Sequence, residues 1–598
     1  MKSSILFLVV MLVAVSLIVP LYFEGFIVMG QTRLKQFSSY DELKNFVRTS
    51  SPYYYFSRGE LGELILLDSN AELKSGDFFL SPLSVPTDYS RTNVQVEGVD
   101  EGDIVKTDGE YIYHVSGRNV TIVRAYPPEN AEILSQIKLN GTISSIYING
   151  NKLVVFEGID NAVYYEILTP AVVTPEVKPY PYYVALPTIS IRVYDVSDRA
   201  NPVQTRNVTL EGSYFASRMI GDYVYAVINE RIYANQTWVA LPKIYSNGEV
   251  NEIKATEIYH SSVSDYYNIY TTLLAINTQD DAQEPTSKTI LLGSASSMYV
   301  SMNNIYITFQ GYIGEQIMPN PRKGMSPTSV PVWGTTIHKV RIENGDVEIG
   351  PSGSVIGNVL NQFSMDEYNG YFRIATTNWE QAGPQNNVYI LDMDLNIVGR
   401  LENFAPQDET MDSARFIGDR CYLSTSVIRR DPFFVIDLAN PTEPKVLGYL
   451  KIPGFTRYLH PYDENHIIGV GKDGNVVKIS LFDVSNVSKP IEIDKYMING
   501  TWSDTPVLNE HKAFLFSEVK NLLAFPVSVH ILNDQWQGIY VFNITLSEGF
   551  VLRGKITHLS YYVERSLYID NVLYTVSAKK IKMNSLENLA EINEIELP

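Results

Sequence analysis

From about residue 102 to the C-terminus, apolar and polar residues alternate in short runs separated by turn-forming pairs such as G-D, N-G, D-N and D-G. Alternation with a period of two is typical of strands with one buried face, and these pairs are typical of tight hairpin turns. The period of about 3.6 residues that marks amphipathic helices is almost absent from this part of the chain. The pattern therefore predicts an all-β fold over most of the sequence.

Two kinds of module recur along these runs. The first is a strand, a tight turn and a second strand, as in "SRMIGDYVYAVI" (217–228), "ARFIGDRCYLST" (414–425) and "RSLYIDNVLYTV" (565–576). The second is an apolar strand that ends in Asp before a turn with Pro, as in "IRVYDVSDRANPV" (191–203) and "FFVIDLANPTEPK" (433–445). Together they predict four-stranded units, which begin near residues 102, 143, 214, 294, 361, 411, 456, 502 and 562.

Tandem four-stranded units build a β-propeller, in which antiparallel blades surround a central channel and few strand edges are exposed. We therefore predict a single β-propeller of eight or nine blades over residues 92–598. Two stacked β-sandwiches are the structural alternative. They fit less well, because the same first hairpin recurs through to the last unit.

The N-terminal part of the chain has a different character. The apolar run "ILFLVVMLVAVSLIVPLYF", residues 5–23, approaches the length of one bilayer crossing, about 20 residues. No A-x-A-like cleavage site follows it, so an uncleaved signal anchor is favoured over a cleaved signal peptide. We expect residues 1–29 to be this segment and residues 30–91 to hold one short helix and a stalk or packing segment. The remainder is then extracytoplasmic at the cell membrane, or secreted if the signal is cleaved.

Several stretches carry a resemblance to a known family, among them "TNVQVEGVDEGDIVKTDGEYIY", "SARFIGDR", "FFVIDLANPTEPKVLGYLKIPGF" and "YLHPYDENHIIGVGKDG". The sequence resembles the secreted archaeal and bacterial proteins with a C-terminal β-propeller domain, distantly related to WD40 repeats. Its blade module also looks like the short LVIVD-type repeat. The resemblance implies the fold and export, but it implies no assigned reaction.

The charge and the cysteine content exclude some classes of function. The net charge is −20, and no cluster of Lys and Arg is present, so nucleic acid is not expected as a partner. The single cysteine, Cys421, rules out an intramolecular disulfide and a Cys-based zinc site. No G-x-S-x-G, Walker A or dinucleotide fingerprint appears. We expect a monomer without a cofactor.

An acidic cluster, Asp100, Glu101 and Asp103, lies where the first unit begins. Its spacing does not match an EF-hand loop, so a Ca²⁺ site and a solvated acidic surface are the alternative interpretations. Other units carry an arginine near the same point of the innermost strand. These arginines are Arg218, Arg415, Arg457 and Arg565. We predict that the three acids pair with some of them where the ring closes, although converging arginines could also hold an anionic ligand.

Three long insertions, about 157–189, 229–270 and 310–335, fall between the second and third strands of their units. In a propeller these connections share one face with the connections between blades, so the insertions should thicken that face. Aromatic residues on such loops are typical of contact surfaces. The predicted binding-face residues are Tyr180, Tyr182, Tyr183, Trp238 and Trp333. A lid packed over the blades, with no partner, is the alternative.

Taken together, these features favour a membrane-tethered β-propeller that binds or scaffolds protein or glycan partners outside the cytoplasm. The alternative is a cell-surface enzyme, a hydrolase or lyase, that acts on an external glycan or peptide at the channel mouth. No catalytic residue can be assigned from the sequence, and an enzyme is the less favoured interpretation.

Overall fold

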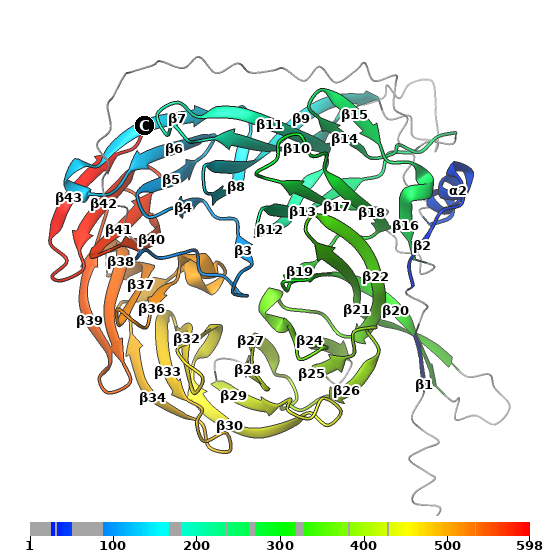
Figure 1. The fold of residues 1–598 in the computed structure, drawn as a ribbon. Helices are drawn as coiled ribbons and strands as arrows, with labels where there is room; N and C mark the ends of the chain where they lie inside the picture. Colours follow the sequence, from blue (N-terminus) through cyan, green and yellow to red (C-terminus); the bar gives the residue numbers. More distant parts are fainter. Residues whose placement is uncertain are drawn as a thin grey trace, which may run out of the picture.

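The computed structural model describes residues 26–29, 33–50, 88–166, 181–234, 237–261, 269–318, 328–380, 383–426, 430–532 and 534–598. Within these residues the chain forms nine antiparallel sheets that follow one another around a ring (Figure 1). The first strand of each sheet lies nearest the centre and the fourth lies at the outer edge. The predicted all-β ring of four-stranded units is therefore confirmed, and the described residues give nine of them.

The strands of the first five sheets, from the centre outwards, have the following bounds. Sheet 1 contains β4 (Val105–Thr107), β5 (Tyr111–Ser116), β6 (Asn119–Arg124) and β7 (Glu132–Lys138). Sheet 2 contains β8 (Thr142–Asn149), β9 (Lys152–Glu166), β10 (Pro181–Asp195) and β11 (Val203–Glu211). Sheet 3 contains β12 (Ser213–Ile220), β13 (Tyr223–Arg231), β17 (Ile269–Asn277) and β18 (Thr286–Leu292). Sheet 4 contains β19 (Ser297–Val300), β20 (Asn304–Met318), β21 (Thr328–Glu343) and β22 (Asp346–Ile356), and sheet 5 contains β23 (Met365–Tyr368), β24 (Tyr371–Glu380), β25 (Gly383–Leu391) and β26 (Ile397–Leu401).

The remaining four sheets complete the ring. Sheet 6 contains β27 (Thr410–Ile417), β28 (Arg420–Ser426), β29 (Arg430–Asp437) and β30 (Lys445–Pro453). Sheet 7 contains β31 (Phe455–Pro461), β32 (His466–Asp473), β33 (Val476–Asp483) and β34 (Ile491–Met497). In sheet 8 the first strand is split into β35 (Trp502–Asp504) and β36 (Leu515–Ser517), followed by β37 (Leu522–Ile531), β38 (Asp534–Thr545) and β39 (Gly549–Ile556). Sheet 9 contains β40 (Val563–Ile569), β41 (Val572–Ser577), β42 (Lys580–Ser585) and β43 (Glu591–Glu596).

Apolar clusters between neighbouring sheets hold the ring together. Strand alternation gives each sheet two apolar faces, and each face packs on the next sheet. Between sheets 6 and 7, for example, the rings of Phe433 and Phe482 stack 4.6 Å apart, and both are fully buried. The last sheet packs on the first through a cluster that includes Ile112, Val123 and Tyr574. Hydrophobic packing therefore continues across the junction where the ring closes.

Among the residues that the structure describes, the closing sheets 9 and 1 exchange no strand, but the chain that precedes sheet 1 binds to sheet 9. The Ser90 amide donates to the carbonyl of Tyr568 (2.9 Å), and the Asp570 amide donates to the carbonyl of Asp88 (2.7 Å). This short bridge lies on the central edge of β40. It extends sheet 9 inwards and begins the path of the chain through the middle of the ring.

The insertion at residues 229–270 does not lie where the sequence predicts. Residues 229–270 form β14 (Lys243–Ser246), β15 (Glu249–Glu252) and β16 (Ile258–His260). Strand β14 pairs with β11, and β16 pairs with β18, so this insertion reaches the outer edges of sheets 2 and 3. The prediction that it thickens one face of the ring is wrong for this part, because the outermost strands offered unpaired backbone groups that the insertion covers.

The predicted short helix is confirmed as α2 (Tyr40–Ser50), which follows β2 (Lys35–Gln36). Its apolar side chains, Leu43 and Val47, are buried in the core cluster of sheets 2 and 3. None of the helices in the described ranges is long and apolar enough to cross a membrane. The predicted membrane segment, residues 1–29, lies outside the described residues except for β1 (Phe26–Met29), which pairs with β20.

Phe482→Ala should destabilise the ring strongly, because it removes a stacked ring from the core between two sheets. We expect a loss of about 3–5 kcal/mol in the free energy of unfolding, measured by denaturant titration. Ile491→Ala, on the exposed outer strand of the same sheet, is the control and should cost roughly 1 kcal/mol or less. Equal losses for the two variants would contradict inter-sheet packing as the main source of stability.

Candidate functional site

Residues 88–103 cross the centre of the ring and touch the inner side of most of it (Figure 1). The Asn93 side chain donates to the Tyr458 hydroxyl (2.9 Å) and to the His511 carbonyl (2.9 Å). The Gln95 side chain donates to the carbonyl of Met365 (3.1 Å) in β23 of sheet 5. These two side-chain amides satisfy groups of sheets 7, 8 and 5. We call residues 88–103 the crossing segment.

The acidic part of the crossing segment ends on sheets 2 and 3. Strand β3 (Asp100–Glu101) pairs antiparallel with β12, and Asp103 forms a bridge with Ile146 of β8. Gly98 precedes this part with a φ of +83°, a conformation that glycine adopts without strain. The tight turn at Gly98 therefore lets the chain reverse towards β12 before it enters sheet 1.

Glu101 is the most enclosed acid of the cluster, with 3% of its surface exposed. Its carboxylate lies 3.5 Å from the Arg218 guanidinium and 3.2 Å from Nε2 of His511. The backbone amide of Gln95 also donates to it (3.1 Å). Burial alone would raise the pKa of Glu101, but the charge of Arg218 and the close contact of the His511 imidazole hold that pKa well below its usual value. Glu101 is therefore an anion that the surrounding groups satisfy.

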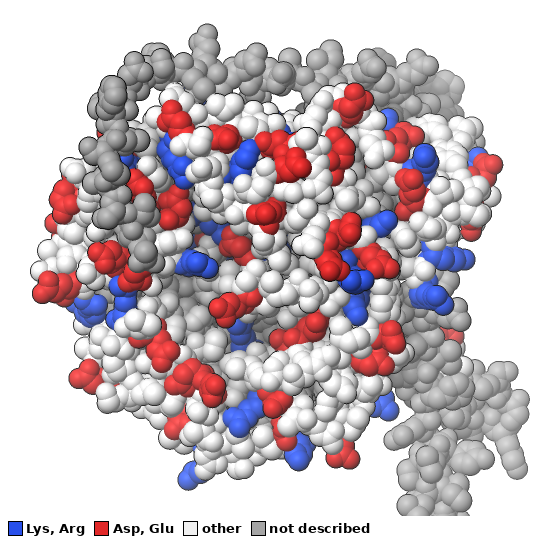
Figure 2. Space-filling model, viewed as in Figure 1, with Lys and Arg blue, Asp and Glu red and all other residues white. Residues whose placement is uncertain are grey.

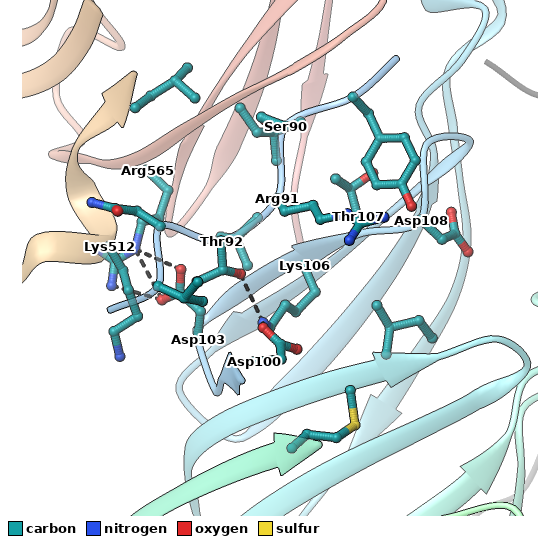
Figure 3. Close-up of a pocket in the computed structure, with 18 of the residues that line it drawn as sticks. Ser90, Arg91, Thr92, Asp100, Asp103, Lys106, Thr107, Asp108, Lys512 and Arg565 are labelled. Atoms are coloured by element: carbon teal, nitrogen blue, oxygen red, sulfur yellow. Dashed lines mark hydrogen bonds and ion pairs between the residues drawn. The ribbon is translucent and has the colours of Figure 1, made fainter. Parts of the chain in front are cut away.

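Asp103 meets another of the predicted arginines. Arg565 of β40 donates to it through Nε (3.0 Å) and Nη2 (2.8 Å), and both side chains are buried. A paired geometry of this kind is the strongest arrangement of guanidinium and carboxylate. Asp100, which is more exposed, pairs with Lys106 (2.7 Å) instead of an arginine. Figure 3 shows Asp103 directed at Arg565 and Asp100 directed at Lys106.

The other two predicted arginines do not meet the acidic cluster. Arg415 donates to the carbonyl of Gln95 (3.3 Å), and its guanidinium lies 4.9 Å from the centre of the Phe363 ring. Arg457 lies 3.5 Å from Asp412 of the neighbouring sheet. The predicted set therefore divides into two arginines that bind the cluster and two that bind elsewhere around the channel.

A cavity of about 550 Å³ opens beside the crossing segment. It lies between this segment and the inner parts of sheets 1, 2, 3, 8 and 9 (Figure 3). Asp108, Asn149 and Gly150 line it, and they lie in turns between first and second strands or, for Asn149, at the strand end that leads into such a turn. The cavity therefore approaches the end of the ring at which these turns emerge.

In this cavity the acidic side chains have cationic partners, but one of the basic side chains has no acidic partner among the described residues. Its acids are all paired: Asp100 and Asp103 as described, and Asp108 with Arg199 (3.2 Å). Arg91 also lines the cavity and is exposed, and within the described residues it has no acidic partner. The hydroxyl of Ser566 is buried there without a hydrogen-bond partner in the same part of the chain. The arrangement leaves hydrogen-bond donors, and one positive charge, for an incoming group.

Comparison with known proteins agrees with the ring of sheets. A family model described as "Beta propeller domain" matches residues 89–589. The chain belongs to the β-propeller domain family.

The relatives of this propeller extend over nearly its whole length. It is 28% identical to an uncharacterized protein of Archaeoglobus fulgidus, with 94% of each chain covered. It is 30% identical to an uncharacterized protein of Methanocaldococcus jannaschii, with 94% of this chain and 91% of that one covered. Neither name assigns a reaction, so the family fixes the fold and leaves the function to the geometry of the site.

Solved structures give only distant likenesses. The Pseudomonas aeruginosa periplasmic gluconolactonase PpgL is matched at a TM-score of 0.33 and 9% identity, over 54% of this chain and 91% of that one. A functionally unknown protein from Desulfotomaculum acetoxidans is matched at 0.31 and 10% identity, over 54% and 92%. Likenesses this weak carry no argument about the activity of the propeller.

Sequence reasoning missed the groups that complete the propeller's acidic site. His511 and Lys512 lie between β35 and β36, in an interruption of the first strand of sheet 8. The Lys512 ammonium donates to the Gly102 carbonyl (3.0 Å). Gln362 also donates to Glu101 (3.2 Å). No local pattern marks these residues, since their role depends on which segments face each other across the channel.

The predicted binding-face residues are placed unevenly. Trp333 is exposed on the hairpin of β20 and β21, whereas Trp238 is half-buried next to Val239, which hydrogen-bonds to Tyr40 of α2. Tyr180 lies outside the described residues, and so do the side chains of Tyr182 and Tyr183. None of the placed residues lines the channel cavity. As for the alternative Ca²⁺ site, the described ranges contain no group of three acidic, His or Cys side chains that could hold a metal.

Glu101→Gln should destabilise the propeller by about 3–5 kcal/mol at pH 7, because it leaves Arg218 without its charge partner in a buried site. The folded-state pKa of Glu101 lies below the reference of 4.5, so its contribution to stability is present above that pH. It is lost as the pH falls below 4.5, and the difference between wild type and variant should narrow there. Denaturant titrations at several pH values measure this difference.

Asp100→Asn provides the matched control for this prediction. Its side chain is 32% exposed and pairs with one lysine, so its loss should cost roughly 1 kcal/mol or less. If Glu101→Gln costs no more than Asp100→Asn, or if its cost does not change with pH, the buried ion pair does not stabilise the ring as inferred.

Proposed function

We propose that this chain is an extracytoplasmic, membrane-tethered β-propeller that acts as a binding module, with the channel cavity as its ligand site. The observation that carries the proposal is the state of the charges in the cavity. Each of its three acids is held by a cation, while Arg91 is left without an acidic partner among the described residues. A general acid or base needs a group that is free to exchange a proton near the working pH. Carboxylates that are paired with cations do not provide such a group, whereas a guanidinium without an acidic partner is available to bind an anion.

The ligand is expected to present a carboxylate or phosphate group on a protein or glycan partner. A guanidinium matches the two oxygens of such groups, and the Ser566 hydroxyl and Lys512 ammonium lie in the same cavity. The volume of about 550 Å³ is typical of sites for small ligands or for the end of a larger one. Since the chain as a whole carries a charge of −20, attraction of an anion depends on these local cations.

Charge distribution over the surface supports the exclusion of nucleic acid as the partner. In Figure 2, acidic and basic side chains are interspersed over the visible face, without a continuous basic field. Backbone phosphate recognition needs such a field. The membrane tether is supported by the apolar run of residues 5–23.

An external hydrolase or lyase is the second candidate, and two carboxylates favour it. Burial raises the pKa of Asp412 in β27 and of Glu564 in β40. Each lies at a β-bulge of an innermost strand, a feature that often re-aims a side chain near a functional site. Asp412→Asn and Glu564→Gln should abolish turnover of a glycan or peptide substrate if the chain is an enzyme, and they should leave binding in the cavity intact if it is not.

Arg91→Ala should weaken binding of small anions by roughly tenfold or more, which is about the effect of losing one charge-assisted hydrogen-bonding group. Titration calorimetry with glucuronate, inorganic phosphate and an acidic hexapeptide measures the affinities. Arg118→Ala, which removes an exposed arginine from a turn at the other end of sheet 1, is the control and should have no effect. If both variants lose affinity for the anions to the same extent, or if neither does, the cavity is not the anion-binding site.

A further inference from the structure

The two ends of the ring differ in the side chains that they expose. Connections between second and third strands, and between successive sheets, emerge at one end of the ring. For example, the Thr501 amide, in the connection between sheets 7 and 8, donates to the carbonyl of His530 (2.8 Å), close to the end of β37 from which the next connection starts. Large apolar side chains are exposed at this end on sheets 4, 5, 8 and 9. They include Trp333, Trp379, Leu532, Leu559 and Tyr562. We call this end the aromatic face.

The exposed groups of the aromatic face are held in place by the loops that carry them. The Gln535 amide donates to the Tyr562 hydroxyl (3.1 Å), and the Gln537 amide donates to the Leu559 carbonyl (3.0 Å). Leu532 and Leu559 are nevertheless 85% and 81% exposed. At the opposite end the exposed apolar side chains in turns are aliphatic, for example Val519, Met302, Val203 and Leu546, whereas the exposed tryptophans of the described residues lie at the aromatic face. The concentration of exposed Trp and Tyr side chains at one end points to a surface that is covered when the protein functions.

Lysines accompany the tryptophans at this end. The Lys472 ammonium lies 5.1 Å from the Trp502 ring centre, and the Lys555 ammonium lies 5.5 Å from that of Trp536. Aromatic rings with adjacent lysines are typical of the interface between a bilayer and water, where each side chain has an apolar body and a polar tip. This composition fits a lipid surface.

The path of the chain connects the aromatic face to the N-terminal apolar run. Phe26 of β1 pairs with Ile317, close to the tip of the β20–β21 hairpin, and Trp333 lies on the same hairpin. Only Glu24 and Gly25 separate Phe26 from the apolar run of residues 5–23. A tether of two residues spans less than about 10 Å, so a bilayer that holds the run lies next to this hairpin.

We propose that the aromatic face rests on the surface of the lipid bilayer, with its Trp, Tyr and Leu side chains in the interfacial layer. This inference rests on the membrane tether of the proposed function. The channel cavity then opens away from the membrane, because the turns with Asp108 and Asn149 lie at the other end of the ring. Since the chain carries a charge of −20, contact of the aromatic face with the bilayer depends on insertion of its apolar side chains and does not require anionic lipids.

Intrinsic fluorescence tests this inference without a label, because all five tryptophans lie after residue 237 and none lies in the apolar run. The full chain is reconstituted into phosphatidylcholine vesicles with brominated acyl chains, and its emission is compared with that in unbrominated vesicles. We expect bromine to quench roughly a third of the emission or more, since tryptophans of the aromatic face reach the interface. Leu532→Asp with Leu559→Asp should reduce this quenching, and Val519→Asp, at the opposite end, should leave it unchanged.

Flotation of the same vesicles separates the two ways in which the inference can fail. If the chain does not float with the vesicles, the tether is absent, and both this inference and the membrane part of the proposed function are overturned. If it floats but its emission is not quenched, or if the two aspartates have no effect on quenching, only the docking of the aromatic face is overturned. Unquenched emission together with concentration-dependent dimers would assign the face to a second copy of the chain.

Discussion

Two buried ion pairs, Glu101–Arg218 and Asp103–Arg565, join one short segment to sheets 3 and 9 of the ring. Removing charges from water is costly, and it is tolerated only where partners and hydrogen bonds are complete. Here the partners come from sheets 3 and 9, with His511 of sheet 8 as a third contact. The position of the crossing segment is therefore fixed by groups that are far apart in the sequence, and the shape of the cavity follows from it.

The ring itself depends on a different principle. Each sheet packs on its neighbours through apolar side chains, and the junction of sheets 9 and 1 continues this packing without an exchanged strand. A closed ring without strand exchange needs something else to resist opening at that junction. The bridge from Asp88 and Ser90 to β40, and the Asp103–Arg565 pair that follows it, act there. Closure and the candidate site are thus built from the same residues.

The number and limits of the sheets could be predicted because hairpins and strand alternation are local. A four-stranded unit was predicted to begin near residue 411, and β27 begins at Thr410; another was predicted to begin near residue 456, and β31 begins at Phe455. The contacts of the candidate site were harder to predict from the sequence, because the choice of arginine that pairs with each acid depends on position around the ring. Arg415 has the same local pattern as Arg218, yet it contacts Phe363 and the backbone of Gln95. Lys106 and His511 carry no local signal of their role.

The segment that fills the centre of the ring can be examined directly by amide hydrogen exchange of the full chain. If ion pairs and hydrogen bonds hold it there, the amides of Val99, Glu101 and Asp103 should exchange as slowly as those of the inner strands β12 and β40. In Glu101→Gln they should exchange faster, while the outer strands are unchanged. Fast exchange of these amides in the wild-type protein would contradict the view that the segment is a fixed part of the ring.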